Sequence, residues 1–388
     1  MEVILERPDA VRLALLPPLA LYIHIPWCVR KCPYCDFNSH ERSGALPERE
    51  YVERLIEDLE ERLPSVWGRR LASVFIGGGT PSLFSPDSID ALLSALRARL
   101  PLEPGAEVTL EANPGTVEAG RFRGFRQAGV NRISIGVQSF DDRMLGALGR
   151  IHSASEARRA IDAAAAAFDN LNLDLMYGLP GQDAAMARAD IETALAFGVP
   201  HLSAYQLTLE PNTVFWSRPP ALPEHDLCAD MQLAAEELLG AAGYEHYEIS
   251  AFAKPGRRCR HNLNYWEFGD YLGIGAGAHG KLSFPDRVTR HERAKQPTEY
   301  LKSLSGKETD IPARELPFEF MLNALRLVEG FDVALFSERT GLPLATVEKQ
   351  LSNAEARGLI ERDWRRIRPT ARGRLFLNEL LALFLPAR

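Results

Sequence analysis

Three cysteines near the N-terminus are the residues best suited to chemistry. Cys28, Cys32 and Cys35 are three of the five cysteines in the chain, and their spacing is C-x3-C-x2-C. Iron–sulfur clusters usually take four thiolate ligands, so three leave one iron with an open position. Catalytic metal sites keep such a position open, whereas structural sites close it. S-adenosylmethionine can fill it with its amino and carboxylate groups, and an electron from the cluster then cleaves the sulfonium to a carbon radical.

Two other interpretations of these cysteines stay open on spacing alone. They could hold zinc with His24 or His40 as a fourth ligand, or they could be ordinary buried thiols. A disulfide framework is not expected. The chain is long, its cysteine count is odd, and its first 21 residues lack a cleavable secretion signal.

Strands and helices alternate from residue 22 to about residue 252, and this pattern can position the cysteines. Apolar strand candidates lie at 19–25, 72–77, 107–112, 132–137, 172–177 and 201–209, and helix candidates lie between them at 48–63, 86–100, 116–128, 154–167 and 184–197. Ser85 before Pro86, and Ser153 with Glu156, are helix start signals. Such alternation predicts a parallel sheet with right-handed crossovers. The number of units favours an incomplete (β/α)6 barrel, and a doubly wound open sheet is the alternative.

The strand ends are the places to look for a site in such a barrel. Gly77, Gly78 and Gly79 follow the second strand and precede Thr80. Glycines let the backbone approach a ligand closely, and we expect their N–H groups to be free to bind it. A flexible turn is the alternative.

Polar residues also mark the later strand ends. Glu111 ends the third strand and Gln138 the fourth, and Arg150 follows twelve residues after Gln138, where it could clamp a carboxylate. Asp174 lies among apolar residues of the fifth strand, and a buried carboxylate is costly unless it is paired or bound. Thr208 lies in the sixth. Asp174 is therefore the strongest candidate acid.

The motif of three cysteines with Tyr34 before the third, preceded by residues 22–27, resembles the signature of the radical S-adenosylmethionine superfamily. Within it, the chain resembles the oxygen-independent coproporphyrinogen III oxidase family and its heme-chaperone branch, along nearly its whole length. The resemblance implies a partial barrel, a 4Fe-4S cluster held by the three cysteines, and bound S-adenosylmethionine. It assigns the following residues to the S-adenosylmethionine region: Tyr22, Tyr34, Gly78, Gly79, Thr80, Glu111, Gln138, Arg150, Asp174, Thr208 and Gly277. Some of these serve a second S-adenosylmethionine in the oxidase.

A second distinctive stretch runs from Cys259 to Trp266. Its histidine, cysteine and two aromatics could ligate heme iron and stack on the ring, whereas the plain alternative is a loop that caps the barrel with aromatic core residues. In the heme-chaperone branch this His-Asn-x-x-Tyr-Trp motif is associated with heme. The resemblance therefore assigns heme binding to His261, Asn262, Tyr265 and Trp266.

The pattern changes near residue 281. Helices are expected at 315–327, 334–340, 344–357 and 372–383, with a small hairpin at 360–368, which is the outline of a winged helix. The sequence thus predicts an N-terminal lead at 1–21, a radical-SAM barrel with its extension at 22–280, and a smaller, mainly helical, winged-helix-like domain at 281–388. This C-terminal region is rich in arginine, but the family uses it as a lid. DNA binding is therefore not expected.

The bulk composition is that of an ordinary globular protein. Its 388 residues are 46% hydrophobic and 25% charged, with a net charge of −7, which argues against nucleic acid as the main partner. No apolar run approaches the length of a membrane span. We expect a cytoplasmic protein, because thiols stay reduced there.

Two departures separate this chain from the oxidase it resembles. Phe37 stands where the oxidase has a fourth cysteine, and only 21 residues precede Tyr22, where the oxidase has a longer extension. The first hypothesis is therefore a heme chaperone that delivers heme to acceptor proteins, respiratory ones included, and that needs an electron donor. The alternative is an enzyme that oxidatively decarboxylates coproporphyrinogen III propionates to vinyls.

Overall fold

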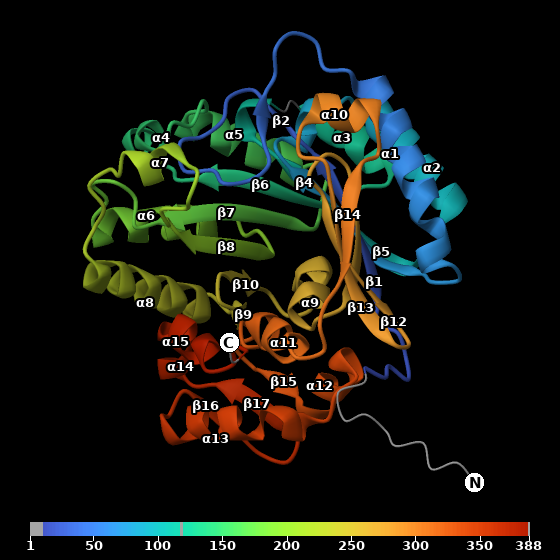
Figure 1. Cartoon of the computed structure of the whole chain (residues 1–388). Coiled ribbons are helices and arrows are strands. Elements are labelled where there is room, and N and C mark those ends of the chain that lie inside the picture. Colours follow the sequence, from blue (N-terminus) through green and yellow to red (C-terminus); the bar gives the residue numbers. More distant parts are fainter. Residues whose placement is uncertain (1–10, 117–118, 387–388) are drawn as a thin grey trace.

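One large sheet forms the body of the molecule in the computed structural model, which describes residues 11–116 and 119–386 (Figure 1). In spatial order its strands are β14 (Gly306–Asp310), β13 (Arg287–Arg293), β12 (His279–Phe284), β11 (Asp270–Ile274), β1 (Leu19–Ile25), β4 (Leu71–Gly78), β5 (Leu102–Ala112), β6 (Arg132–Gln138), β7 (Leu171–Tyr177), β8 (His201–Gln206), β10 (Ala251–Ala253) and β9 (Glu245–Glu248). From β11 to β8 in this order neighbouring strands are parallel, and the strands outside them are antiparallel. The sheet is an open, partial barrel, as the sequence predicted.

Most of the crossover helices pack on their neighbours along the chain. The crossover helices are α1 (Glu48–Arg62), α2 (Pro86–Arg99), α3 (Ala119–Ala128), α5 (Ala154–Ala165), α6 (Ala184–Ala196) and α8 (His225–Ala241). Consecutive helices pack on one another from α1 to α5, and α6 packs on α8. A doubly wound sheet would instead place crossover helices on both faces. The partial-barrel prediction is therefore the correct one of the two.

Local sequence signals place the starts of these helices. The Ser85 side chain accepts a hydrogen bond from the Ser88 N–H, with Pro86 in the first turn of α2. Ser153 and Glu156 form the predicted capping box at the start of α5. The helix expected at 116–128 begins at Ala119, and residues 117 and 118 of that prediction lie outside the described residues.

Short elements complete the body of the molecule. They are β2 (Trp27–Cys28), β3 (His40–Glu41), α4 (Asp142–Ala147), α7 (Val214–Ser217), α9 (Arg260–Trp266) and α10 (Pro297–Lys302). β2 and β3 pair with each other, so they close the loop that carries the cysteines at its base.

A smaller helical region follows the large sheet. It contains α11 (Leu316–Ala324), α12 (Val333–Thr340), α13 (Glu348–Ala356), α14 (Ala371–Leu375) and α15 (Leu377–Ala382), with an antiparallel sheet of β15 (Phe331–Asp332), β17 (Arg366–Pro369) and β16 (Ile360–Arg362). The expected hairpin is present, and so are the helices, with two differences. The helix expected at 372–383 is broken at Phe376 into α14 and α15, and residues 344–347 form a 3-10 helix before α13. Phe320, Phe336 and Leu351 lie in the apolar core of this region, together with Val11 and Leu13 from the N-terminal lead.

The boundary expected after residue 280 falls inside β12. Strand–helix alternation does stop there, but the sheet continues through β13 and β14 to Asp310 as antiparallel strands. β11 was also missed as a strand, although it pairs in parallel with β1 and is buried along its whole length. Its short, glycine-containing sequence gives no clear period. Residues 1–10 of the expected lead lie outside the described residues.

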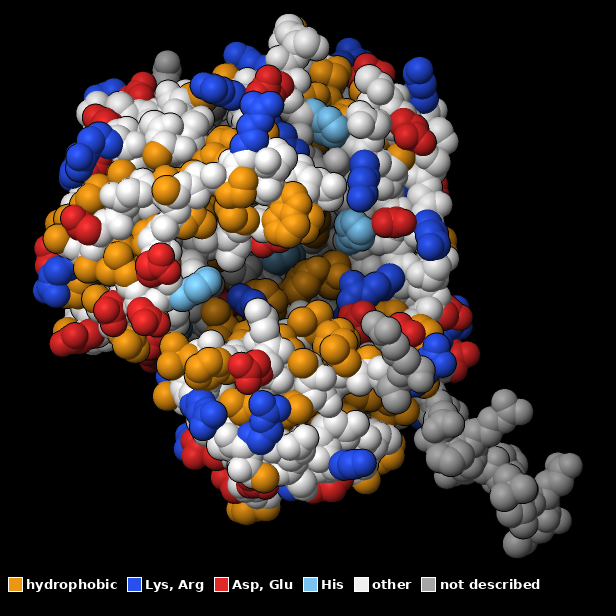
Figure 2. All heavy atoms as spheres, turned by 60° about the vertical axis from the view of Figure 1, so that its left-hand side comes forward, with side chains coloured by type: hydrophobic (Ala, Val, Ile, Leu, Met, Phe, Trp, Pro, Cys, Tyr) orange, Lys and Arg blue, Asp and Glu red, His pale blue; other side chains and the backbone are white. Residues whose placement is uncertain are grey.

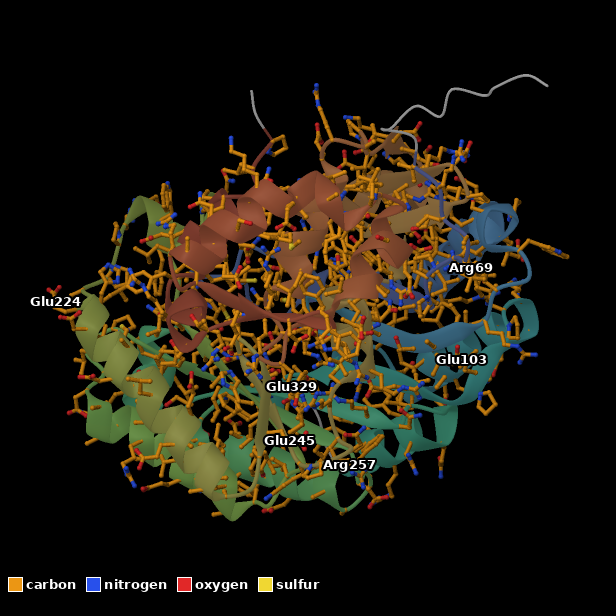
Figure 3. All side chains as sticks on the ribbon, turned by 90° about the horizontal axis from the view of Figure 1, so that it is seen from below. Arg69, Glu103, Glu224, Glu245, Arg257 and Glu329 are labelled. Carbon is orange, nitrogen blue, oxygen red and sulfur yellow. The ribbon has the colours of Figure 1, made fainter. Side chains whose placement is uncertain are left out.

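Charged pairs join the helical region to the large sheet. In the view from below, Glu245 and Glu329 lie near each other (Figure 3). Arg258 bridges them, with its Nε 3.1 Å from Glu245 and its Nη2 3.1 Å from Glu329. The two regions therefore meet at the end of the sheet near β9.

Candidate functional site

The three cysteines border one cavity at the end of β1. Polar groups accompany their sulfurs: the Thr80 hydroxyl lies 3.5 Å from Cys28 Sγ, and Arg150 Nη1 lies 3.6 Å from Cys32 Sγ. Within the part of the chain that the structure describes, no three His, Cys, Asp or Glu side chains lie close enough together to hold a single metal ion. Burial raises the pKa of Cys28 and Cys35, so these thiols become thiolates when a bound metal or another positive charge stabilises them. Hydrogen-bond donors beside the sulfurs fit an anionic, thiolate-held group.

Long-range hydrogen bonds hold the cysteine loop in place. Asn38 Nδ2 donates to the backbone oxygens of Ala276 and Lys295, both at 2.9 Å. His24 Nε2 donates to the Asn38 backbone oxygen at 2.9 Å, which leaves His24 Nδ1 to accept from the Tyr22 hydroxyl at 3.0 Å. Tyr22 thus supports the loop and does not border the cavity. Asn38 is a supporting residue that the sequence did not single out.

The glycines after β4 allow close packing against the cysteine loop. Gly78 has φ +115°, and a Cβ there would lie 2.6 Å from the His24 ring; a Cβ on Gly79 would lie 2.6 Å from the Trp27 backbone oxygen. Their N–H groups are not free, contrary to the prediction. Gly78 donates to Glu111 Oε2 at 3.1 Å and Gly79 to the Ile25 oxygen at 2.8 Å. The glycines therefore leave space for a ligand beside the backbone, while the N–H groups of Gly78 and Gly79 are already used in hydrogen bonds within the protein.

Two buried carboxylates face the same cavity. Burial, and then the charge of Asp174, raise the pKa of Glu111 to about 8. Burial also raises the pKa of Asp174, which accepts hydrogen bonds from Ser134 at 2.9 Å and from Asn172 at 2.8 Å. A pair of closely placed acids with raised pKa values favours a ligand that brings positive charge or hydrogen-bond donors.

The cavity has a volume of about 370 Å³. Of the residues that the resemblance assigned to S-adenosylmethionine, it is lined by Tyr34, Gly78, Gly79, Thr80, Glu111, Gln138, Arg150, Asp174 and Thr208. Gln138 has φ +70°, an uncommon value for a residue with a side chain, at an irregularity between β6 and β7. Gly277 lies outside the lining and packs against Asn38, because a Cβ there would lie 2.3 Å from the Asn38 amide.

Several lining residues were not predicted. Ser134 is one, and it shares the inward face of β6 with Gly136 and Gln138, so the period-two pattern of that strand could have identified it. Arg30 and Asn113 also line the cavity. Both lie in loops, where no periodicity is available.

The second distinctive stretch forms α9, apart from this cavity. His261 is 5% exposed, its Nδ1 lies 3.0 Å from the Ser73 hydroxyl, and its ring stacks on Phe75 at 4.9 Å. Burial, and then the charge of Arg132, lower the pKa of His261 to about 3, so the imidazole is neutral near pH 7. A neutral imidazole with one nitrogen held by a hydrogen bond has the form of a metal ligand.

The aromatic residues of α9 are packed within the protein. Tyr265 stacks on Tyr271 with ring centroids 4.3 Å apart, and the guanidinium of Arg326 lies 4.4 Å above the Trp266 ring. The Trp266 Nε1 is buried and has no hydrogen-bond partner among the described residues. Asn262 is half-buried, and none of the four motif residues lines the cavity by the cysteines. The structure therefore separates the two candidate sites.

The described residues contain no helix with both the length and the apolar character needed to cross a lipid bilayer. On one face of the molecule a hollow lies between the main body and the helical C-terminal region, with hydrophobic and histidine side chains at its walls (Figure 2).

Comparison with known proteins agrees with this architecture. Residues 22–194 match the radical SAM superfamily, and residues 311–376 match the HemN C-terminal domain. The fold is similar to that of coproporphyrinogen III oxidase (HemN) from Escherichia coli, with a TM-score of 0.79 and 22% identity over 95% of this chain and 90% of that one. This likeness shows the fold.

Sequence relatives are more specific. Heme chaperone HemW of Escherichia coli (strain K12) is 52% identical over 379 residues, which cover 95% of this chain and 99% of the relative. Heme chaperone HemW of Haemophilus influenzae is 50% identical over 377 residues, 95% of this chain and 98% of the relative. The chain therefore belongs to the HemW family within the radical SAM superfamily.

Proposed function

We propose that this protein is a heme chaperone, which binds a 4Fe-4S cluster, S-adenosylmethionine and heme, and delivers the heme to acceptor proteins. Relatives named heme chaperone HemW are similar to it over 95% of its length. The observation that carries the proposal against the oxidase alternative is Phe37. It stands where the oxidase family has a fourth cysteine, and it lines the cavity with 60% of its surface exposed. The cavity thus has an apolar ring where the oxidase has a thiol.

Membership of the radical SAM superfamily implies a 4Fe-4S cluster and S-adenosylmethionine. We assign the cluster to Cys28, Cys32 and Cys35. The Arg150 guanidinium beside Cys32 supports this assignment, because a buried cation offsets the negative charge of thiolates. When bound, the cluster supplies the electron that cleaves the sulfonium of S-adenosylmethionine.

The cavity residues are assigned to S-adenosylmethionine. Glu111 and Asp174 offer carboxylate oxygens to its hydroxyl and ammonium groups, and the space beside Gly78 and Gly79 admits it close to the backbone. Gln138, Thr80, Thr208 and Tyr34 add polar lining. Tyr22 and Gly277 are assigned a supporting role. Tyr22 donates a hydrogen bond to His24, and Gly277 packs against Asn38, so both help to hold the cysteine loop.

Heme binding is assigned to α9, with His261 as the iron ligand and Asn262, Tyr265 and Trp266 beside the ring. The neutral imidazole supports this, since its Nδ1 is held by Ser73 and Nε2 is the nitrogen left for iron. His261 is 5% exposed and stacks on Phe75, so heme iron cannot reach Nε2 while the packing around α9 stays closed. Heme binding therefore requires α9 or Phe75 to move.

The expected partners follow from this assignment. They are heme, heme-acceptor proteins that include respiratory ones, and an electron donor, with the chain placed in the cytoplasm. Ion pairs in the helical region support the expectation that nucleic acid is not a partner. Arg362 contacts Glu348 at 2.8 Å and Glu355 at 3.0 Å, and Arg368 contacts Glu361 at 2.6 Å. These arginines are engaged by acids of the same region.

One anaerobic experiment tests the proposal against the enzyme alternative. The cluster is reconstituted, reductant and S-adenosylmethionine are added, and the sample is split between heme and coproporphyrinogen III. The proposal expects a shifted Soret band in the heme arm and no protoporphyrinogen in the other. Conversion of coproporphyrinogen III would contradict the chaperone proposal and support the alternative, a decarboxylating enzyme.

A further inference from the structure

A chain of buried hydrogen bonds links the cofactor cavity to the start of the heme motif. Cys259, the residue that precedes α9, donates its backbone N–H to the Tyr247 hydroxyl at 3.3 Å. Tyr247 contacts His201 Nε2 at 2.8 Å, and His201 Nδ1 contacts Asn172 Oδ1 at 2.6 Å. Asn172 Nδ2 then donates at 2.8 Å to Asp174, which lines the cavity. This series of hydrogen bonds therefore runs from one proposed site to the other.

The direction of these hydrogen bonds is fixed from the Asp174 end. An ionised carboxylate can only accept, so Asn172 turns its Nδ2 toward Asp174 and its Oδ1, an acceptor, toward His201. Tyr247 therefore donates to His201 Nε2, and His201 donates from Nδ1 to Asn172. Ser134 adds a second donor to the Asp174 carboxylate at 2.9 Å, and it accepts from Asn172 at 2.8 Å. Aligned hydrogen bonds strengthen one another, so a change at Asp174 alters the bonds further along.

The far end of the chain holds the first turn of α9. Besides the bond from Cys259 to Tyr247, the His261 N–H donates to Glu107 Oε1 at 3.2 Å. The His261 ring is buried and stacks on Phe75, so the packing around α9 must open before heme reaches Nε2. Weaker bonds at the start of α9 therefore favour heme entry.

We infer that Tyr247, His201 and Asn172 are positioning residues that couple ligand binding at Asp174 to heme binding at α9. A ligand hydroxyl that donates to Asp174 competes with Asn172 and Ser134 for its carboxylate oxygens, so the hydrogen bonds from these two residues weaken. The hydrogen bonds from Asn172 to Cys259 then weaken in turn, and the start of α9 is held less firmly. S-adenosylmethionine consequently raises the affinity for heme. This inference rests on the proposed function for its heme readout.

The test measures both ends in the anaerobically reconstituted full-length protein. Heme dissociation constants are determined with and without saturating S-adenosylmethionine, and amide hydrogen exchange is followed in residues 259–266. We expect S-adenosylmethionine to tighten heme binding by about fivefold or more and to speed exchange in that segment. By linkage, heme should tighten S-adenosylmethionine binding by the same factor.

Tyr247→Phe removes one oxygen and so interrupts the series of hydrogen bonds between His201 and Cys259. It should show fast exchange in residues 259–266 without S-adenosylmethionine, and S-adenosylmethionine should no longer change its heme affinity. Tyr244→Phe is the matched control, because Tyr244 is also buried and donates its hydroxyl to the Val199 backbone oxygen outside the chain. Iron content and circular dichroism check that both variants fold.

Three results would overturn the inference: no response of residues 259–266 to S-adenosylmethionine in the unmodified protein, a full response in Tyr247→Phe, or an equal loss in Tyr244→Phe. The first does not depend on any variant folding. If the unmodified protein bound no heme while its exchange still responded, the proposed function would fail and the coupling to α9 would stand.

Discussion

The cavity by the cysteines and α9 both present groups that can bind a ligand, but these groups are not equally accessible. Around the cavity, Glu111 comes from the end of β5, Asp174 from the middle of β7 and Arg150 from the segment after α4. All three face a space of about 370 Å³. Hydrogen bonds from Gly78, Ser134 and Asn172 hold the two acids in place. A ligand can enter without disturbing the sheet, so this site is organised in advance.

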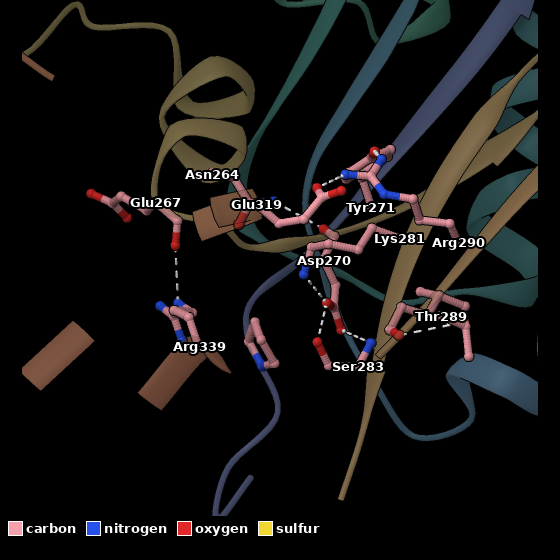
Figure 4. Close-up of polar contacts among 12 residues, drawn as sticks. Asn264, Glu267, Asp270, Tyr271, Lys281, Ser283, Thr289, Arg290, Glu319 and Arg339 are labelled. Carbon is pink, nitrogen blue, oxygen red and sulfur yellow. Dashed lines mark hydrogen bonds and ion pairs between the residues drawn. The ribbon is translucent and has the colours of Figure 1, made fainter. Parts of the chain in front are cut away.

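The α9 region is closed by comparison. Asn264 donates to the Asp270 backbone oxygen at 2.9 Å, and Arg339 donates to the Glu267 backbone oxygen at 3.2 Å (Figure 4). Behind them, Asp270 is buried with Lys281 and Ser283 as partners. The proposed heme binding at α9 would break these contacts, whereas the cavity by the cysteines is already open. The comparison teaches that a ligand of the cavity meets a preformed site, whereas a ligand of α9 needs the helix to move.

The largest effect should come from removing a proposed cluster ligand. Cys32→Ser deletes a thiolate, and we expect the iron, the sulfide and the brown chromophore to be almost completely lost after anaerobic reconstitution. Cys228→Ser is the control, because Cys228 is a buried cysteine of α8 that does not line the cavity. A Cys32→Ser protein that keeps its full iron and sulfide would contradict the assignment.

His261→Ala should affect heme binding at α9 and leave the cavity by the cysteines unchanged. We expect at least a hundredfold loss of heme affinity in a Soret titration, because the iron loses its proposed ligand, while the cluster spectrum is unchanged. His225→Ala, at the exposed start of α8, serves as the control and should bind heme normally. Equal heme affinity in both variants would move the heme site elsewhere.

Sequence reasoning grouped most of the assigned residues that line the cavity, because the geometry of parallel strands is regular. The carboxyl halves of parallel strands meet at one edge of a sheet, so residues such as Glu111 and Asp174 could be grouped without coordinates. The same reasoning missed Asn38, which joins the cysteine loop to Ala276 and Lys295 across most of the chain. No local pattern indicates such a contact.

The α9 region was harder to predict for a physical reason. His261 is held by Ser73 and Phe75 on a strand nearly two hundred residues earlier in the chain. The burial of His261 and its separation from the cysteines depend on tertiary packing, and the sequence of the motif predicts neither of them. The antiparallel strands β12 to β14 were missed for a similar reason, since they extend the sheet without crossover helices.

Ser73→Ala tests whether His261 is oriented for iron. Removing this hydroxyl frees Nδ1, so the ring can turn, and we expect heme affinity to fall about tenfold. Ser139→Ala is a matched control, because Ser139 is fully buried and donates to Asp190 instead. Loss of the Ser73 hydroxyl should cost about 1 kcal/mol of unfolding free energy, and loss of the Ser139 hydroxyl about 2 kcal/mol, because its partner is a carboxylate. A heme affinity that falls equally in both would reflect stability and not orientation.

The smallest effect concerns the charge of the cavity. Because the pKa of Glu111 is raised to about 8, this carboxyl is mostly protonated at pH 7. Binding a cationic sulfonium ligand favours the ionised form and releases the proton. Affinity for S-adenosylmethionine should therefore rise about fivefold between pH 7 and pH 8, and about twofold more above pH 8 before it levels off. Isothermal titration at several pH values measures this change.

Glu111→Gln removes the titrating group, so the share of the pH dependence that Glu111 causes should vanish, and the affinity at pH 8 should fall. Glu224→Gln, at the exposed start of α8, keeps the full slope (Figure 3). If Glu111→Gln retains the same slope, the titration belongs to the ligand's own amino group. The cavity would then act by shape and hydrogen bonding, and its charge would not distinguish it from the α9 region.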